Sequence, residues 1–473
     1  GLLYIQCVGG YDTIDCVRSS ISPGRMVRHH PMDPAESTLS GPLPRFAHTS
    51  WFPLVLLLPF LINGLVDLPR MLEFGSVSVM GGLTILQVLL ACAALALAGA
   101  FPRRGLVHLG WYGAFLSWMF LRSTIDPPDQ NGWQNAFVYV LFAVYGLLAA
   151  TMATSRPHVA VLMCRRGIAA IDVMAIGLVG LNLLIFGLPP QTGEDATWFI
   201  GPRAVALLAI APICWHLAAW CHGRPRASLR ALAWIVTVMA TMSRTATAVA
   251  LGCAGLAFLA QAWTAPRRFV RQVPLVMVGL IVMAGVVFAF QAQFRERFLG
   301  GYNNVEVAGV SISTSGRDTI WATVIASGMR HPIWGAGLGS SQAALFEFGS
   351  DVGHPHNDYL RVWHDGGILG LVFILAAFAQ LLAVLTRQWR RATTRGSLHP
   401  EVHLAAVLTL IAVLLTSTTD NGFVYVYVMG PAGLLTGLAL GVGIRDEGAR
   451  AVSGASPNLA PAASTGTVPA YGS

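Results

Sequence analysis

The feature that most constrains this chain is a series of apolar runs, each close to the length of a helix that crosses a membrane. Such a helix needs about twenty apolar residues at 1.5 Å each to cross ~30 Å of hydrocarbon. Only 11% of the 473 residues are charged and 55% are hydrophobic, whereas a soluble domain has roughly a quarter of its residues charged. The sequence predicts an all-α, polytopic integral membrane protein with about twelve transmembrane helices, at 51–66, 79–100, 105–121, 134–152, 168–188, 202–222, 228–242, 246–263, 270–291, 366–386, 402–418 and 423–443.

The basic residues sort by membrane side. All thirty are arginines, and most fall in the two tails and in alternate loops. With the N-terminal tail in the cytoplasm, the opposite loops hold only nine of them: Arg70, Arg122, Arg203, Arg244, Arg295, Arg297, Arg317, Arg330 and Arg361. Because cytoplasmic loops carry the excess of basic residues, both termini are predicted in the cytoplasm. The net charge of +8 is then explained by sidedness and indicates no nucleic-acid partner.

The pattern predicts five segments along the chain. Ser243-Arg244-Thr245 alone divides the seventh and eighth runs, so eleven or thirteen spans stay open. The loop after the ninth span is far longer than a connector needs, and such loops are usually functional or disordered. The segments are a disordered cytoplasmic tail at 1–50, helices 1–9 at 51–291, a large periplasmic loop at 292–364, helices 10–12 at 365–445 and a disordered cytoplasmic tail at 446–473.

Two arginines are candidates for binding an anion. The span before Arg244 has about fifteen residues, roughly 22 Å of helix, so its guanidinium is expected below the outer surface. An ionised group at that depth costs about 2.5 kcal/mol or more without a partner. Arg317 is expected at the first turn of a helix, where the helix dipole disfavours a cation. The alternatives are an Arg244 that reaches the headgroups and an Arg317 that is a solvated loop charge.

His356 is the candidate proton acceptor, because an imidazole has an unperturbed pKa of about 6.5. Asp358 and Asp365 would orient this ring or, more simply, cap helices. The glycines at 335, 337 and 339 follow no strand and precede no Gly-Lys-Ser/Thr, which excludes a nucleotide-binding loop. No Asp-x-Asp occurs and no cysteine lies in 292–364, so no metal, cofactor or disulfide is expected. Gly433, Gly437 and Gly441 recur every four residues, which favours close helix packing.

Four motifs, in order along the chain, resemble those of the bacterial O-antigen ligase and O-antigen polymerase superfamily. They are Thr241-Met242-Ser243-Arg244-Thr245-Ala246 between two spans, Gly316-Arg317 with Trp321, His331-Pro332-Ile333-Trp334-Gly335 with Gly337, and His356-Asn357 followed after nine residues by Gly367 and Gly370. The last spacing is the most specific. The resemblance extends over about 51–445.

The resemblance implies an inverting, metal-independent glycosyltransferase in the bacterial inner membrane, with its active site facing the periplasm. The donor would be an O-antigen polysaccharide on undecaprenyl pyrophosphate and the acceptor a hydroxyl of lipid A-core. Arg244 and Arg317 would hold the pyrophosphate, and His356 would act as general base on the acceptor hydroxyl or help to organise it. Further candidate contacts to substrate are Arg203, Arg361, Asn357, Asp358 and Tyr359.

Other acceptors and another class of protein stay open. A second lipid-linked glycan as acceptor would make the protein a polymerase, and a protein Ser or Thr would make it an O-oligosaccharyltransferase. Arg317 and Gly328 also fit the Arg, ten residues, Gly pattern of some polymerases, but those resemble one another in carrying it in two large outer loops, and the 189–201 loop is short. A flippase also has about twelve spans, but it would be expected to show internal repeats, and we find none.

Overall fold

The computed structural model describes residues 73–74, 77–98, 103–128, 130–188, 200–289, 304–307, 310–313, 316–349, 353–397 and 399–454. The tail predicted at 1–50, the span predicted at 51–66 and most of the loop before Gly316 lie outside the described residues.

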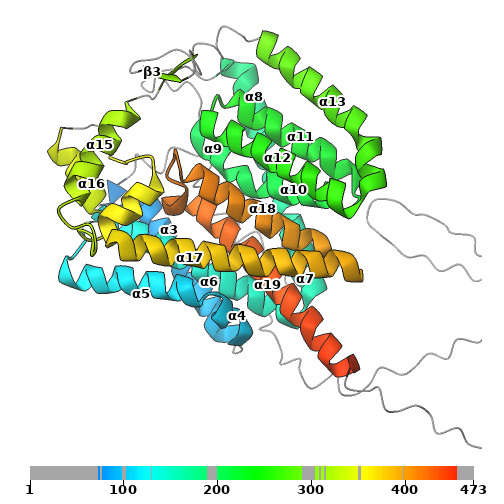
Figure 1. Ribbon diagram of the computed structural model, residues 1–473, viewed down its shortest axis with the longest axis horizontal. Coiled ribbons are helices and arrows are strands. Elements are labelled where there is room, and N and C mark those ends of the chain that lie inside the picture. Colours follow the sequence, from blue (N-terminus) through cyan, green and yellow to red (C-terminus); the bar gives the residue numbers. More distant parts are fainter. Residues whose placement is uncertain are drawn as a thin grey trace, which may run out of the picture. The chain divides into compact units, whose positions relative to one another are not determined.

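Helices account for nearly all of the described residues (Figure 1). In chain order the helical elements are α3 (Val79–Ala98), α4 (Arg103–His108), α5 (Gly110–Ile125), α6 (Gln130–Ser155), α7 (Pro157–Ile171), a π-helix (Asp172–Ile176), α8 (Gly177–Phe186), α9 (Pro202–Leu208), α10 (Ile210–Cys221), α11 (Pro225–Ala240), α12 (Arg244–Thr264), α13 (Pro266–Ala289), α15 (Arg317–Gly328), α16 (Ser340–Glu347), α17 (Asp358–Arg395), α18 (Pro400–Thr416), a 3-10 turn (Gly422–Val424) and α19 (Val426–Gly454). Two short antiparallel hairpins pair β1 (Glu73–Phe74) with β2 (Val77–Ser78) and β3 (Asn304–Val307) with β4 (Val310–Ser313). The helical class predicted from the sequence is confirmed.

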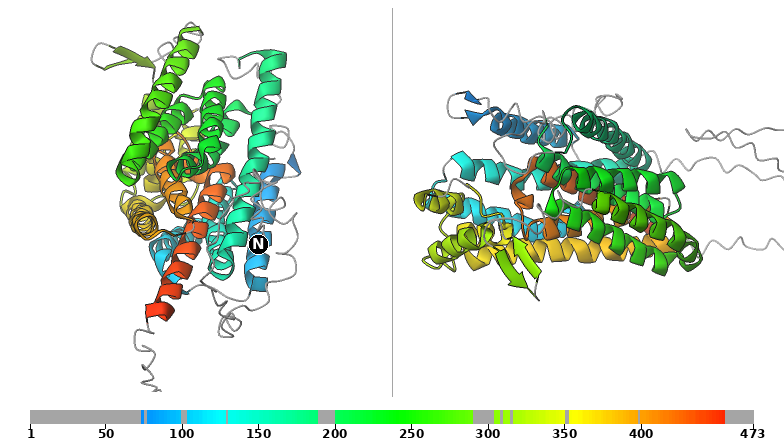
Figure 2. Two further views of the ribbon diagram at one scale, coloured as in Figure 1. Left: turned by 90° about the vertical axis from the view of Figure 1, so that its right-hand side faces the viewer. Right: turned by 90° about the horizontal axis from the view of Figure 1, so that it is seen from above.

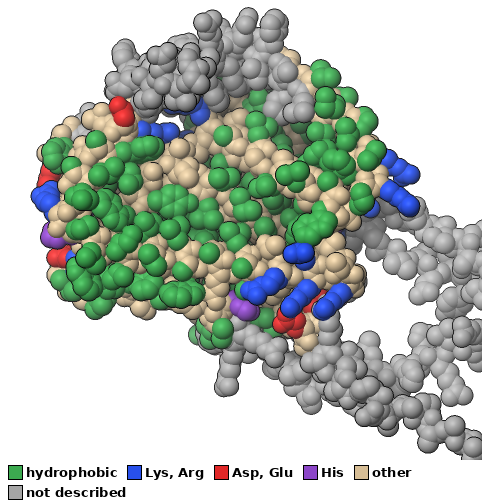
Figure 3. All heavy atoms as spheres, viewed as in Figure 1, with side chains coloured by type: hydrophobic (Ala, Val, Ile, Leu, Met, Phe, Trp, Pro, Cys, Tyr) green, Lys and Arg blue, Asp and Glu red, His purple; other side chains and the backbone are tan. Residues whose placement is uncertain are grey.

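Six stretches of helix in the described part of the chain are long and apolar enough to cross a membrane. They are Gly132–Ser155, Pro157–Phe186, Pro202–Cys221, Arg244–Thr264, Asp358–Arg395 and Val426–Ala449, and shorter apolar helices cover Gly82–Ala96 and Pro400–Thr416. Apolar side chains cover much of the surface over α5 and α17, and arginines gather at the end where α17 stops and α13 starts (Figure 3). These features are those of a multi-pass membrane protein.

Two helices begin earlier than the apolar runs predicted. The run predicted at 168–188 belongs to one span that starts at Pro157, because proline is well placed at the first helical position. Arg165 and Arg166 are therefore helical, although the sequence indicated a loop. Likewise α17 starts at Asp358, inside the loop predicted at 292–364, and the chain between Asp358 and His364 is helical.

The polar start of α17 is fixed by a cap rather than by an apolar stripe. The side chain of Asn357 accepts a hydrogen bond from the backbone N–H of Leu360 at 3.1 Å, which satisfies one of the free N–H groups at the helix start. Gly367 interrupts the helix with φ +67° and ψ −171°. At the other end of the chain, α19 continues to Gly454, so part of the tail predicted at 446–473 is helical.

The glycines of α19 allow it to lie directly against α6. A Cβ atom on Gly437 would overlap the carbonyl oxygen of Gly146, and one on Gly433 would lie 2.5 Å from the carbonyl oxygen of Phe142. Gly441 makes the same kind of approach to Ala150. The close packing predicted from their four-residue spacing is confirmed, and α19 runs alongside α6 in the core of the bundle (Figure 2).

Candidate functional site

Five segments that are distant in the sequence meet beside the start of α17. Trp321 of α15 donates a hydrogen bond to the carbonyl oxygen of Pro355 at 2.8 Å. This bond ties α15 to the turn before α17. The hydroxyl groups of Thr245 in α12 and Thr419 lie 3.0 Å apart. Arg203, at the start of α9, reaches the same turn between α18 and α19. The figures show α15 and α16 packed at this end of α17 (Figure 1).

Two residues of this region have an unusual backbone. His356 has φ +50° and Met242 has φ +56°, and they are the non-glycine residues with positive φ in the described chain. A positive φ is uncommon for residues with a side chain and costs free energy, so it persists where the surrounding structure enforces it, frequently at functional sites. Met242 lies in the turn that delivers Arg244 to the start of α12, and His356 lies in the turn before α17.

The hydrogen bonds around His356 determine which ring nitrogen carries the proton. Nη2 of Arg361 donates to Oδ1 of Asn421 at 2.9 Å, and because arginine only donates, this contact orients the Asn421 amide. The amide nitrogen then faces Nδ1 of His356 at 3.0 Å, and Nη2 of Arg203 lies 2.9 Å from the same Nδ1. With two donors directed at it, Nδ1 is the acceptor, and the neutral ring carries its proton on Nε2.

Arg203 is held in place by a carboxylate. Its guanidinium forms an ion pair with Asp420, in which Nη2 contacts Oδ1 and Nε lies 3.2 Å from Oδ2. The Asp420 side chain is almost fully buried, while that of Arg203 is 43% exposed. Arg203 thus has a fixed orientation and an exposed edge, which leaves room for a second anion beside it.

The electrostatics of the site keep His356 neutral. Burial, followed by the positive charges of Arg203, Arg317 and Arg361, lowers the pKa of His356 from its ordinary 6.5 to about 3. All three guanidinium groups therefore act on this imidazole. A ring with this pKa is uncharged at neutral pH and is a weak base, because protonation would add a cation beside three others.

The structure brings Arg317 and Arg244 to the same end of the bundle. Arg317 is the first residue of α15 and is close enough to affect the pKa of His356. Arg244 is the first residue of α12 and precedes Thr245, which contacts the Asp420 turn through Thr419. Each arginine thus stands at the start of a helix, where free backbone N–H groups favour an anion.

Four of the other candidates contact the protein itself. Asn357 caps α17, and the fully buried carboxylate of Asp358 accepts a hydrogen bond from the backbone N–H of Phe423 at 2.7 Å. The hydroxyl of Tyr359 donates to the carbonyl oxygen of Leu414 at 2.7 Å. Arg361 is 1% exposed and lies 3.7 Å from Asp358. These contacts hold the site together. The substrate-binding role of these four residues stays a prediction.

The glycine motifs make contacts that the sequence did not predict. The backbone N–H groups of Ala336 and Gly337 donate to the carbonyl oxygens of His364 and Asp365, and a Cβ on Gly335 would overlap the backbone of Gly367. The glycines of the third motif thus pack against those of the fourth. Asp365 accepts hydrogen bonds from the backbone N–H groups of Gly339 and Ser341, so it caps α16, as expected.

Asp420 and Asn421 are the site residues that sequence reasoning missed. They lie in the polar run Thr416–Asn421 between two apolar helices, and that position was the only signal available, because the run has the composition of an ordinary connecting turn. Among the residues that the structure describes, no three His, Cys, Asp or Glu side chains group as a metal site would require. The cations that act on His356 are the guanidinium groups of Arg203, Arg317 and Arg361.

The comparison with protein families supports this resemblance. Residues 229–375 match the family model described as Wzy_C, O-antigen ligase. This part of the chain is similar to the O-antigen ligase superfamily. No curated protein matches the chain. The match includes Arg244, Arg317 and His356, and all four motifs lie inside it. Arg203 and Asn421 lie outside it but contact His356 within it, and Asp420 holds Arg203. Members of this superfamily are glycosyltransferase-like membrane enzymes.

Proposed function

We propose that this protein is an O-antigen ligase, which moves O-antigen polysaccharide from undecaprenyl pyrophosphate to a hydroxyl of lipid A-core. The observation that carries the proposal is the gathering of Arg203 and Arg317 beside one neutral imidazole, with Arg244 at the start of the neighbouring α12. Guanidinium groups bind phosphate oxygens in a bidentate way. The distribution of arginines supports about twelve spans in the bacterial inner membrane, with both termini cytoplasmic and this cluster facing the periplasm.

The arginines would stabilise the leaving group. In the transfer, the bond between the anomeric carbon and the pyrophosphate oxygen breaks, and a bond to the acceptor oxygen forms on the opposite face, which inverts the configuration. Negative charge develops on the pyrophosphate as it leaves. Fixed cations and helix N-termini directed at that charge lower the barrier without a metal ion. Because pyrophosphate is a good leaving group, the remaining task is to position the acceptor hydroxyl.

For His356 the geometry favours the organising role over the general base. Its Nδ1 already accepts from Asn421 and Arg203, and its Nε2 carries the proton. We therefore assign Nε2–H as a hydrogen-bond donor to a phosphate or acceptor oxygen. The hydroxyl proton of the acceptor would pass to water on its own side of the anomeric carbon and end on the released pyrophosphate, because phosphate groups of this kind ionise near neutral pH.

The acceptor distinguishes the ligase from its relatives. One oversized outer loop in the sequence favours the ligase over a polymerase with two. Polymerisation of a second lipid-linked glycan and transfer to a protein Ser or Thr use the same donor, and the arginine cluster serves them equally well. A flippase would need no leaving-group stabilisation, so the packed anion site favours an enzyme.

The test is reconstitution of the full chain in vesicles with lipid-linked glycan and lipid A-core, in the presence of a chelator and without nucleotide. A lipid A-core product of higher mass on a gel supports the ligase. The variants Arg244→Ala, Arg317→Ala and His356→Ala should lose the product, while the exposed His331→Ala should keep it. Unchanged activity in the three variants would refute the site, and glycan movement without a covalent product would indicate a flippase.

In cells, a lipopolysaccharide gel from a deletion strain separates the two nearest alternatives. Loss of all long-chain ladders with accumulation of lipid-linked polymer is the result expected of a ligase. A core carrying one repeat unit would instead indicate a polymerase.

A further inference from the structure

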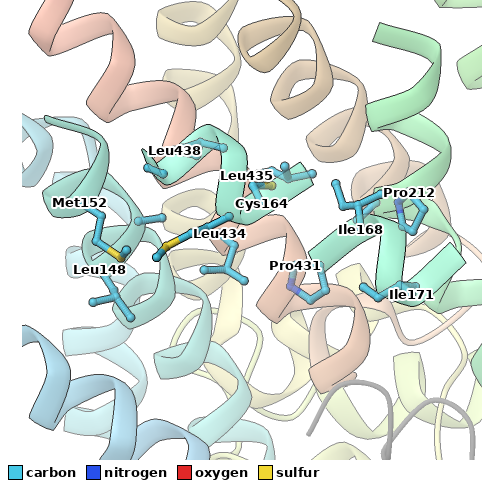
Figure 4. Close-up of a pocket in the computed structure, with 14 residues that line it drawn as sticks. Leu148, Met152, Cys164, Ile168, Ile171, Pro212, Pro431, Leu434, Leu435 and Leu438 are labelled. Carbon is cyan, nitrogen blue, oxygen red and sulfur yellow. The ribbon is translucent and has the colours of Figure 1, made fainter. Parts of the chain in front are cut away.

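A groove lined by apolar side chains lies between α7 and the core of the bundle. It is formed by α6, α7, α10 and α19, is partly open, and has a cavity volume of about 90 Å³. The close-up shows the apolar side chains of these helices directed into it (Figure 4). Its lining includes Leu148, Met152, Ile168, Ile171, Leu434 and Leu438.

The span that contains α7 is tied to α10 and α11 by hydrogen bonds at the end of α7. At the deep end, the carboxylate of Asp172 accepts a hydrogen bond from the indole of Trp234 at 2.7 Å and lies 2.9 Å from Nε2 of His216. This contact coincides with the π-helix Asp172–Ile176, a distortion that often marks a functional position. The α7 and α8 span is 28% buried, whereas the span of α10 behind it is completely buried.

The length of the groove fits one hydrocarbon chain of one leaflet. Its lining on α7 runs from Ala160 to Ile171, which is roughly 16 Å of helix at 1.5 Å per residue. Half of the hydrocarbon core is about 15 Å thick. An acyl chain that starts at the Ala160 end would therefore reach the Asp172 contact at the middle of the bilayer.

The charges identify the end at which a headgroup would lie. Arg156 precedes Ala160 by about one helical turn, and Arg165 and Arg166 follow Cys164, which lines the groove. Nε of Arg165 is buried and has no hydrogen-bond partner among the described residues. A cluster of arginines beside an apolar chain site favours a lipid with an anionic headgroup.

The opposite end of the groove does not open into the candidate active site. Pro431 of α19 lines the deep end, and between it and Tyr425 of the site the residues Val426–Gly430 are all buried. The polyprenyl tail of a donor whose pyrophosphate lies at Arg203 would have to pass through this packed segment.

From the length, the apolar lining and the arginines at one end, we propose that the groove binds one acyl chain of an anionic phospholipid, with its headgroup at Arg156 and Arg165. The lipid fills the space under α7 and supports the packing of that helix on the core. This site is separate from the proposed transfer reaction, so the two proposals succeed or fail independently.

The test uses the full chain in vesicles that contain phosphatidylglycerol with a photoreactive diazirine near the end of one acyl chain. Mass spectrometry of the cross-linked peptides should find the label on the groove face of α7 and on α19 around Leu434. Ala149→Phe, which fills the groove, should remove this label, while Leu162→Phe, on the exposed face of the same helix, should not. Ala149→Leu is the milder variant if the larger side chain lowers folding.

Two further experiments distinguish an anionic phospholipid from other sources of the bound hydrocarbon chain. The variants Arg156→Gln and Arg165→Gln should each weaken labelling by the phosphatidylglycerol about fivefold. The control Arg387→Gln, toward the C-terminal end of α17, should not. A zwitterionic diazirine lipid should label the groove more weakly. Uniform labelling of all lipid-facing helices, or preferential labelling of the groove by a diazirine polyprenyl phosphate, would overturn the proposal.

Discussion

The amide of Asn421 helps to set the protonation of His356, because its nitrogen lies 3.0 Å from Nδ1, where Arg203 also donates. Nη2 of Arg361 donates a hydrogen bond to the oxygen of that amide at 2.9 Å, which fixes the orientation of the amide. The relay from a buried arginine through an amide to an imidazole presents Nε2–H to the site. This arrangement reverses the one found where a carboxylate accepts a hydrogen bond from Nδ1–H and leaves Nε2 free to act as a base.

Replacing the amide with a carboxylate should weaken the preference for the Nε2–H tautomer. In Asn421→Asp, a carboxylate oxygen replaces one of the two donors directed at Nδ1 of His356, while Arg203 remains as the other donor. We expect transfer to fall by up to roughly 10²–10³-fold, the effect of losing one donor to developing charge. The measurement is product formed per minute by vesicles with equal amounts of folded protein. Activity close to that of the wild type would show that the tautomer is not essential.

Substitution of the histidine itself separates a donor from a base. A glutamine amide donates a hydrogen bond but accepts no proton at neutral pH, so His356→Gln should keep measurable transfer, whereas His356→Ala should lose it. His331→Gln, at an exposed histidine of the same region, serves as the control. Equal and complete loss in both His356 variants would favour general-base catalysis.

The pH dependence of stability follows from the lowered pKa of His356. The unfolded chain binds a proton at about 6.5 and the folded chain only at about 3, so between these values the unfolded state binds more protons. The contribution of this group to stability is therefore present above pH 6.5 and is lost as the pH falls toward 3. Melting temperatures of the wild type measured from pH 7 to pH 4 should fall more steeply than those of His356→Gln.

The transfer rate should respond differently from the stability. Because His356 stays neutral over the range, kcat/KM should show no ionisation of this group between about pH 5 and 8. A loss of kcat/KM below about pH 6.5 in the wild type that is absent in His356→Gln would contradict this expectation.

Substitutions of Arg361 and Arg317 should differ in their effects on stability and on transfer. Arg361 is 1% exposed beside the buried carboxylate of Asp358, so Arg361→Gln leaves a buried charge without its partner and should cost about 3–5 kcal/mol of unfolding free energy. Arg317→Gln removes a cation at the partly exposed start of α15 and should leave the melting temperature unchanged while transfer falls about 10²–10³-fold. Thermal melting and transfer measured on the same preparations check both. A stable Arg361→Gln protein would indicate that the buried pair contributes little.

The contact of α19 with α6 makes a packing prediction. Gly437→Val introduces side-chain atoms where even a Cβ would overlap the backbone of Gly146, and it should cost about 1–3 kcal/mol or more. Gly448 of the same helix has no atom within 4 Å of a built Cβ, so Gly448→Ala should be neutral or stabilise by about 0.5–1 kcal/mol, because alanine favours a helix over glycine. Equal melting temperatures for the two variants would show that the close approach is not required.

Properties that depend on residues close together in the sequence were predictable. Apolar runs indicated a helical membrane protein, and the four-residue glycine spacing indicated the packing of α19. The motifs around residues 244 and 317 indicated Arg244 and Arg317 as candidate site residues. The starts of α7 and α17 were predicted too late, because a first-position proline and an Asn357 cap begin these helices before their apolar stretches do. Composition alone records the apolar stretch and not the cap.

The amino-acid sequence by itself determined the helical membrane class and indicated the arginines of the site. Only the tertiary structure decided what those residues do. The tautomer of His356 depends on Asn421, sixty-five residues away, and on Arg203, 153 residues away. A pKa and a hydrogen-bond direction depend on the groups that surround an atom in space, and residues so far apart in the chain become neighbours only when the helices pack.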